Sequence, residues 1–160
     1  HVLRDPAVLT EVNVEHLLRE LQATYPNWSQ PHADIQIVRP IPAVLGHTAL
    51  LAQCFSNLVG NAIRFVAPGV RPRIRIWAEP REDSVRINIQ DNGIGIPPEC
   101  HHRVFGMFQR LHPANEYEGT GIGLTIVRRA AQRMGGQVGF DSKPGEGSIF
   151  WVELSRADVK

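Results

Sequence analysis

One aspartate followed by two glycines is a candidate ligand-binding turn. Asp91 follows an alternating run over 84–90 that is typical of a strand, and Gly93 and Gly95 come at the next alternate positions. Glycine has no Cβ, so the backbone can turn sharply and a flat ligand can come close. A carboxylate at the end of a strand can accept a hydrogen bond from the amine of a ring stacked there. An ordinary tight turn is the alternative, and residues 91–96 alone do not separate the two.

A stripe of amides on a predicted helix is the second candidate. Asn57 and Asn61 lie one turn apart within residues 48–66, and Arg64 continues the stripe. The apolar spacing of that helix predicts a buried face made of Leu51, Cys54, Phe55, Leu58, Ala62 and Phe65. Asparagine is a weak helix former, so two in line favour a function, with side-chain oxygens facing a hard cation or a phosphate. A solvated face is the alternative, although lysine and glutamate would serve it better.

A glycine-rich turn before another helix is the third candidate. Residues 119–123 read Gly-Thr-Gly-Ile-Gly and open a helix whose predicted buried face is Leu124, Val127, Ala131 and Met134. Free N–H groups and the positive end of the helix dipole can hold phosphates at such a turn. The turn has neither the Gly-Lys-Ser/Thr of a Walker A loop nor the spacing of a dinucleotide fingerprint.

Strands and helices predicted around these motifs alternate along the chain. The sequence predicts a helix from about residue 14 to 24, strands over 34–38, 73–77, 84–90, 138–141 and 148–154, and a hairpin turn at 80–83. Residues 1–13 carry little pattern, and 44–46 are expected to be a short connection. Residues 97–118 are irregular, which is typical of a functional lid or a disordered segment. We expect a lid that is mobile from about residue 101 to 117 without ligand.

Composition excludes several classes of protein. The chain has 160 residues, 42% of them apolar and 21% charged, with a net charge of +1. These values fit one globular domain and do not favour nucleic-acid binding. Two cysteines are too few for a disulfide scaffold, and no apolar run reaches membrane-spanning length. Cys100, His101, His102 and His112 fit no common structural zinc spacing. The first residue is His1, so we expect a piece cut from a longer protein.

Four motifs in one order carry a family resemblance. Over roughly residues 11–154 the chain resembles the ATP-binding catalytic domain of sensor histidine kinases, within the gyrase, chaperone, histidine kinase and mismatch-repair ATPase superfamily. Residues 57–65 look like the N box of that family, 91–96 like its first glycine box, 104–108 like its F box and 119–124 like its second glycine box. The lid stretches 108–112 and 117–121 are similar to phytochrome-type and related cytoplasmic sensor kinases.

The resemblance implies a fold and a domain arrangement. The expected fold class is α+β, a two-layer Bergerat-type sandwich with a mixed, mostly antiparallel five-stranded sheet and three helices on one face. Residues 1–10 would be a linker remnant and 11–156 the catalytic domain. The implied cofactors are ATP and Mg²⁺, and the isolated domain is expected to be a cytoplasmic monomer.

The resemblance also assigns site residues. Asp91 would bond the adenine amine, with Gly93 and Gly95 making room for the ring. Asn61 would coordinate Mg²⁺ with support from Asn57, and Arg64, where lysine is more usual, would touch a phosphate; these three are the expected catalytic residues. The further ATP-binding residues implied are Phe65, Ile96, Phe108, Arg110, Gly119, Thr120, Gly121, Ile122, Gly123 and Leu124.

Several residues depart from the family pattern, and they bear on the phosphate acceptor and on the competing functions. None of the seven histidines is followed by an acidic residue, so the expected acceptor is a histidine on a separate dimerising hairpin of the parent kinase, with a response regulator downstream. His47 stands where an acidic residue is frequent, and we expect it to affect a helix cap. A stand-alone ATPase is one alternative, but Asn57 occupies the position of its catalytic glutamate and cannot take a proton from water. A degenerate protein-interaction module is another alternative, and the intact motifs argue against it.

Overall fold

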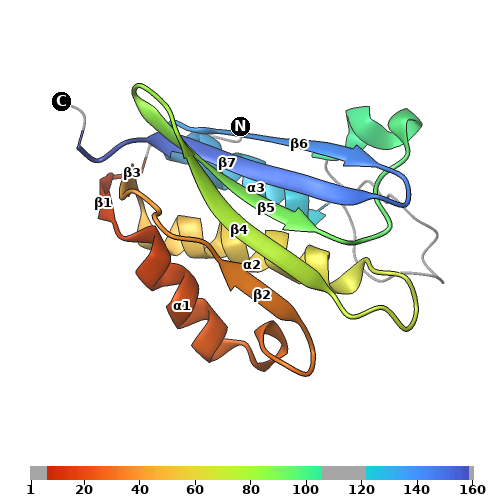
Figure 1. Cartoon of the computed structure of the whole chain (residues 1–160). Coiled ribbons are helices and arrows are strands. Elements are labelled where there is room, and N and C mark those ends of the chain that lie inside the picture. Colours follow the sequence, from red (N-terminus) through yellow and green to blue (C-terminus); the bar gives the residue numbers. More distant parts are fainter. Residues whose placement is uncertain (1–6, 106–121, 159–160) are drawn as a thin grey trace.

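A mixed five-stranded sheet with helices on one side makes up the molecule (Figure 1). The computed structural model describes residues 7–105 and 122–158. The sheet has the order β2-β4-β5-β7-β6, with β2 and β4 parallel and the other neighbours antiparallel. Its strands are β2 (Asp34–Ile37), β4 (Arg73–Pro80), β5 (Ser84–Asp91), β6 (Gln137–Lys143) and β7 (Gly147–Ser155). The helices are α1 (Val14–Thr24), α2 (Thr48–Arg64) and α3 (Ile122–Arg133), with short 3-10 helices η1 (Pro26–Trp28) and η2 (Pro98–Arg103).

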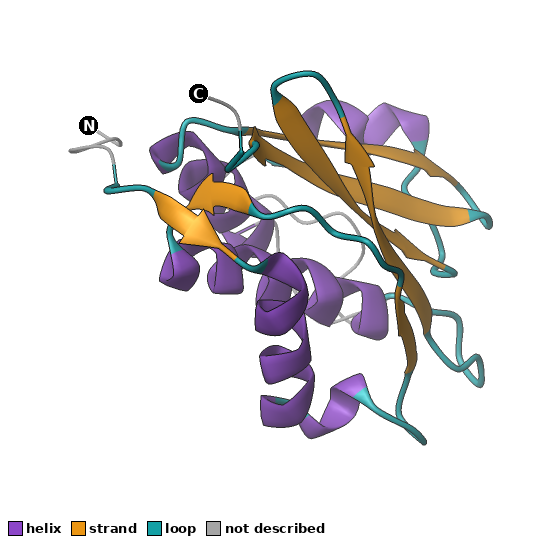
Figure 2. Cartoon of the chain, turned by 60° about the vertical axis from the view of Figure 1, so that its left-hand side comes forward, coloured by secondary structure: helices purple, strands orange, loops and turns teal. Residues whose placement is uncertain are grey.

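The hydrophobic core lies between the sheet and the three α-helices (Figure 2). Strand β5 shows why: Val85, Ile87 and Ile89 are buried at alternate positions, as the period of a strand requires. The chain joins β4 to β5 by a hairpin, as the sequence predicts. The two-layer α+β sandwich with its mixed sheet is therefore confirmed.

Helix ends follow from local chemistry. The Asn13 side chain accepts from the backbone N–H of His16 and starts α1. His47 caps α2, because its Nδ1 accepts from the N–H of Leu50 at 3.3 Å, so the expected effect of His47 on a cap is confirmed. After α3, Gly135 has a φ of 74° and the Gly136 N–H donates to the Ala131 carbonyl at 2.8 Å, which is a Schellman ending.

A small second sheet is absent from the sequence prediction. Strand β1 (Thr10–Val12) pairs antiparallel with β3 (Val44–Gly46), where a plain connection was expected. Each strand has only three residues, so neither carries a period long enough to detect. The predicted boundary between residues 10 and 11 falls inside β1, and the Ala7 N–H donates to the Arg133 carbonyl at 3.1 Å.

The first part of the predicted lid is packed into the core. Cys100 and Val104 are buried, and residues 98–103 form η2, so this part of the irregular stretch belongs to the core. Phe105 meets the rings of Phe140 and Phe150 edge-on, with centroids 6.0 and 6.4 Å away. These contacts are long-range, which is why the local sequence pattern does not reveal them. The rest of the lid lies outside the described residues.

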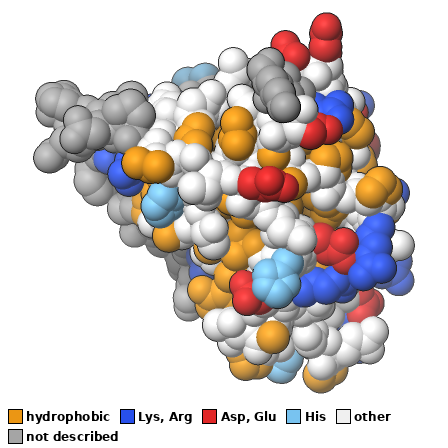
Figure 3. All heavy atoms as spheres, turned by 90° about the vertical axis from the view of Figure 1, so that its left-hand side faces the viewer, with side chains coloured by type: hydrophobic (Ala, Val, Ile, Leu, Met, Phe, Trp, Pro, Cys, Tyr) orange, Lys and Arg blue, Asp and Glu red, His pale blue; other side chains and the backbone are white. Residues whose placement is uncertain are grey.

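The described surface carries charges of both signs. On the face shown in Figure 3, acidic and basic side chains lie beside one another. Glu15 of α1, for example, pairs with Arg19 and with Arg39. Exposed pairs of this kind contribute little to stability. Among the described residues, the structure contains no helix with the length and apolar character needed to cross a bilayer.

Candidate functional site

The carboxylate of Asp91 is fixed at the end of β5 by two backbone donors. Its Oδ1 accepts from the N–H of Gly93 at 2.8 Å and from the N–H of Ser148 at 3.1 Å. Ser148 lies directly opposite Asp91 in the β5–β7 register. In the described part of the chain no donor reaches Oδ2. One oxygen therefore orients the carboxylate, and the other is free to accept from a ligand.

Burial changes the acidity of this group. It raises the pKa of Asp91 from 3.8 to about 6, and the two backbone N–H groups act in the opposite direction. The carboxyl group is therefore mostly ionised at neutral pH, with its charge held in a poorly solvated place. A ligand N–H that reaches it would make a charge-assisted hydrogen bond.

The two glycines after Asp91 are required by close contacts within the chain. A Cβ on Gly93 would stand 2.4 Å from the carbonyl oxygen of Phe65, and a Cβ on Gly95 would stand 2.0 Å from that of Lys143. Gly95 also has a φ of 76°, which side-chain-bearing residues rarely adopt. The sequence suggested that these glycines make room for a ligand. The structure shows a reason within the chain, since both Cβ positions abut protein backbone, and room for a ligand stays a prediction.

Three elements hold the turn after Asp91. The N–H of Ile94 donates to the Phe65 carbonyl at the end of α2, and the carbonyl of Ile94 accepts from Gly145 between β6 and β7. The N–H of Ile96 donates to the Ser142 Oγ at 2.8 Å. Ser142 in turn lies 2.6 Å from the Ser148 hydroxyl. The turn is thus tied to both the helical layer and the sheet.

A small cavity opens beside the Asp91 carboxylate. It lies between α2, the turn, α3 and β7, and its volume is about 40 Å³. Small-molecule sites are commonly about 300–1,000 Å³, so this cavity is much smaller than an ordinary ligand site. Six of the predicted site residues line it together: Asn61, Phe65, Asp91, Gly95, Ile96 and Leu124.

Asn57, Asn61 and Arg64 form the polar stripe of α2, and Asn61 reaches the same cavity. The side chains of this stripe have fewer hydrogen bonds than the Asp91 turn has. Asn61 is half-buried, and its side chain makes no hydrogen bond within residues 7–105 and 122–158. Asn57 donates from Nδ2 to the Gln53 carbonyl at 2.8 Å, and Arg64 is exposed in the last turn. An unengaged amide oxygen suits a hard cation. No group of three or more His, Cys, Asp or Glu side chains in the described ranges could hold one alone. Mg²⁺ is commonly held by one or two protein groups together with phosphate oxygens, which fits this arrangement.

Some predicted residues fall outside the description and some site residues were missed. Five predicted site residues lie outside the described residues: Phe108, Arg110, Gly119, Thr120 and Gly121. Helix α3 begins with Ile122 and Gly123, whose side chains are not described.

Sequence reasoning missed three residues at the site: Ser142, Ser148 and Phe150. The sequence predicts that residues 148–154 form a strand, but it does not give the register of that strand. The structure pairs 148–150 with 89–91, which brings Ser148 and Phe150 to the site.

Comparison with protein families gives a match over most of the chain. Residues 46–158 match the model of the histidine kinase-, DNA gyrase B- and HSP90-like ATPases. The matched range contains α2, the Asp91 turn and α3, and so the whole cavity described above.

Curated relatives include bacterial sensor proteins. The chain is 44% identical over 117 residues to the phytochrome-like protein Cph1 of Synechocystis sp., covering 73% of this chain and 16% of that protein. It is 39% identical over 116 residues to the sensor histidine kinase AruS of Pseudomonas aeruginosa, covering 70% of this chain and 12% of that protein. The chain therefore spans less than a fifth of the length of these relatives.

Solved structures agree with this match. Full-length ShkA in complex with AMPPNP superposes with a TM-score of 0.78 at 28% identity, over 100% of this chain and 33% of that one. The catalytic domain of the histidine kinase ThkA superposes with a TM-score of 0.75 at 25% identity, over 92% of this chain and 97% of that one. The second match spans a separately solved catalytic domain almost end to end.

Proposed function

Because the chain belongs to the family of histidine kinase-, DNA gyrase B- and HSP90-like ATPases, we propose that it binds Mg-ATP and transfers the γ-phosphoryl group to a histidine on a separate acceptor hairpin. It would then be the catalytic domain of a cytoplasmic two-component sensor kinase, with a response regulator downstream. The resemblance to Cph1 and AruS supports the sensor-kinase reading.

One observation carries the proposal: of the two oxygens of the Asp91 carboxylate, only Oδ1 accepts hydrogen bonds from the described residues. Its Oδ1 is oriented by two backbone N–H groups, and its Oδ2 is left for a donor in a cavity that also contains Asn61. The adenine amine is a donor of this kind. A hydrogen bond to a charged group contributes about 1.5–3 kcal/mol, so this contact has a large effect on affinity.

The amide stripe would serve the phosphates. Asn61 would offer its oxygen to Mg²⁺, Asn57 would support the helix beside it, and Arg64 would bring a guanidinium to a phosphate. When bound, Mg²⁺ neutralises charge on the transferring phosphoryl group. An arginine binds phosphate through a planar fork, so its contact differs in geometry from that of a lysine.

A stand-alone ATPase is the competing function. That chemistry needs a base to activate water, and the residue four before Asn61 is Asn57, whose Nδ2 already donates to the Gln53 carbonyl. An amide does not accept the proton from water. We therefore expect the isolated chain to be a monomer that neither phosphorylates itself nor turns over ATP appreciably.

Phosphotransfer to an added acceptor tests the proposal. The chain is mixed with Mg-ATP and with the histidine-bearing hairpin of its own full-length protein, and phosphohistidine and ADP are measured. We expect phosphohistidine only with the hairpin present, and none with Asp91→Ala, which should also abolish nucleotide binding in calorimetry. Steady ADP release without the hairpin, lost in Asn61→Ala, would instead favour the ATPase. Unchanged nucleotide affinity in Asp91→Ala would remove the adenine assignment.

A further inference from the structure

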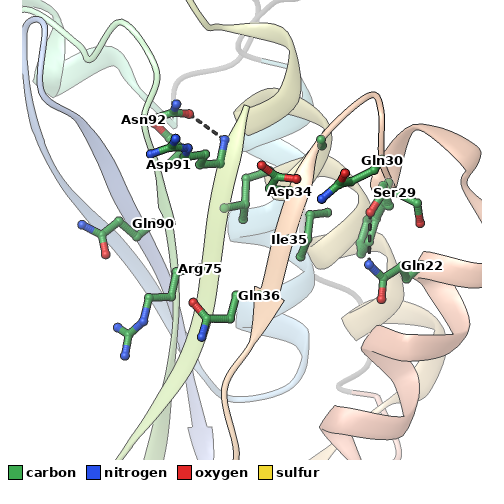
Figure 4. A pocket seen from close by; sticks show the side chains of 14 residues that line it. Gln22, Ser29, Gln30, Asp34, Ile35, Gln36, Arg75, Gln90, Asp91 and Asn92 are labelled. Atoms are coloured by element: carbon green, nitrogen blue, oxygen red, sulfur yellow. Dashed lines mark hydrogen bonds between the residues drawn. The ribbon is translucent and has the colours of Figure 1, made fainter. Parts of the chain in front are cut away.

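A second cavity, far larger than the one beside Asn61, lies at the edge of the sheet. Its volume is about 670 Å³, within the range of about 300–1,000 Å³ common for small-molecule sites. Residues of β2, of the beginning of β4 and of the end of β5 line it, together with the segment that follows α1 (Figure 4). Ile74 is buried in the core, on the face of β4 opposite to Arg73 and Arg75, so the polar side chains of these strands face the cavity. The cavity is thus a separate candidate site.

The carboxylate of Asp34 lines this cavity without a partner. Its Oδ1 is buried and receives no hydrogen bond, and the side chain enters no ion pair within the described residues. Figure 4 shows Asp34 and Gln30 facing one another across the cavity. A buried acceptor without a donor costs free energy, which a ligand donor would recover.

Cationic side chains lie next to this carboxylate, also without acidic partners. Arg73 is the register partner of Asp34 on the neighbouring parallel strand, yet the two do not form an ion pair. Arg75 lies two residues further along β4, with its guanidinium over the ring of Trp77 at 4.7 Å. In the described part of the chain neither arginine has a carboxylate partner. One cavity therefore contains unpaired groups of both signs.

The spacing of these groups fits a ligand with both charges close together. Neighbouring strands lie about 4.8 Å apart, so Asp34 and Arg73 can meet an ammonium and a carboxylate that share one carbon. The side-chain amides of Gln36 and Gln90, which Figure 4 shows on the same side of the sheet as Arg75, can both donate and accept. We infer that this cavity binds a small zwitterion of the α-amino acid class, with its ammonium at Asp34 and its carboxylate at Arg73.

The Asp91 turn separates this site from the nucleotide cavity. Asp91 lines both cavities, and Asn92 joins the turn to β4: its Oδ1 accepts from the Arg73 N–H at 2.8 Å and its Nδ2 donates to the Arg71 carbonyl at 3.1 Å. Asp34 does not line the small cavity beside Asn61. A change at Asp34 therefore tests the zwitterion site without removing the proposed ATP site.

Three matched probes test the inference by NMR amide shifts of the isotope-labelled chain. L-Leucine carries both charges, isoamylamine lacks the carboxylate and isocaproate lacks the ammonium. We expect leucine to shift the amides of Ile35, Ile74 and Asn92 saturably. Each analogue should bind more weakly than leucine by about tenfold or more, because it loses one charge-assisted hydrogen bond. Tighter binding of phosphoethanolamine than of leucine would overturn the carboxylate assignment in favour of an amine-phosphate head group.

Two variants complete the test. Asp34→Asn should weaken leucine binding about tenfold or more and leave nucleotide binding unchanged. Asp141→Asn makes the same change on an exposed aspartate of β6, at the opposite edge of the sheet, and should leave leucine binding as it is. The inference is overturned if leucine gives no saturable shift at the cavity, or if Asp34→Asn binds leucine as well as the unchanged chain does.

Discussion

The two ends of the nucleotide cavity are built in opposite ways. At one end, the turn carrying Asp91 is held by backbone bonds from the end of α2, from the β6–β7 connection and from β7. At the other end, Asn61 has no hydrogen-bond partner within the described residues, and Arg64 is exposed. The first end is preorganised and the second can adjust.

This difference matches what each end would bind. An adenine ring is rigid and is recognised by few contacts, so a fixed carboxylate orients it at little entropic cost. A triphosphate with Mg²⁺ is flexible and changes during transfer, so side chains without fixed partners can follow it. Changes at the rigid end should therefore alter folding, and changes at the adjustable end should alter ligand binding alone.

Gly95→Ala should have the largest effect on folding. Its Cβ would lie 2.0 Å from the Lys143 carbonyl oxygen, at a φ of 76°. We expect a loss of about 3 kcal/mol or more in the free energy of unfolding, from backbone strain together with overpacking. Urea denaturation measures it. Gly60→Ala in α2 is the control, because nothing lies within 4 Å of its Cβ position and helix propensity predicts a gain of about 0.5–1 kcal/mol. Equal stability of Gly95→Ala and the unchanged chain would show that the turn is not rigid.

Asp91→Asn should separate stability from binding. The native pKa of Asp91, about 6, lies above its ordinary 3.8. The native state therefore binds the proton more tightly, and its stability decreases as pH rises from about 4 to 6. We expect Asp91→Asn to be more stable than the unchanged chain at neutral pH, by at most about 3 kcal/mol, and this difference to vanish near pH ~4. Parallel stability curves for the two proteins between these pH values would contradict the raised pKa.

The same carboxylate should give nucleotide binding a pH dependence. The ionised form accepts a hydrogen bond better, so we expect affinity for an ATP analogue to fall as pH drops below about 6, with a slope of at most about tenfold per pH unit. Asp91→Asn should bind the analogue about 10–100-fold more weakly at neutral pH. The variant also serves as the control, because pH effects on the nucleotide itself remain in it. Calorimetry over the pH range measures both proteins.

Ser142→Ala should have an intermediate effect. Its hydroxyl accepts from the Ile96 N–H and contacts the Ser148 hydroxyl, and all three groups are buried. Removing it leaves a buried donor unpaired, which costs about 1–3 kcal/mol. Thermal unfolding measures this cost, and hydrogen exchange at Ile96 localises it. Unchanged protection of that amide would show that Ser142 does not hold the turn.

Asn61→Ala should have the smallest effect on folding. The amide has no partner in the described residues, and alanine is the better helix former, so we expect stability to stay within about 0.5 kcal/mol. Nucleotide affinity should lose most of its dependence on Mg²⁺, which calorimetry with and without the metal measures. Asn57→Ala is the matched comparison one turn earlier and should retain more of that dependence. A large loss of stability in Asn61→Ala would show that both ends of the cavity are rigid.

Local patterns in the sequence were sufficient for much of this protein. Alternation and helical spacing predicted the strands of the main sheet and the three α-helices, because a strand or helix with one buried face repeats its apolar residues at a fixed period. The four ordered motifs predicted the family. The positions of Asn61, Asp91 and Leu124 on one cavity followed from that resemblance, and the structure brings these three together.

Only the tertiary structure decided the remaining features. The β1–β3 pair, the ring of Phe105 against Phe140 and the Ser148 N–H on Asp91 each join residues far apart in the chain. The reason for glycine at 93 and 95 is the approach of two other backbone segments, which a local pattern does not contain. Burial sets the pKa of Asp91, and the parallel pairing of β2 with β4 sets Asp34 beside Arg73. Periodicity reports which face of an element is buried, whereas the elements that meet there are chosen by packing of the whole chain.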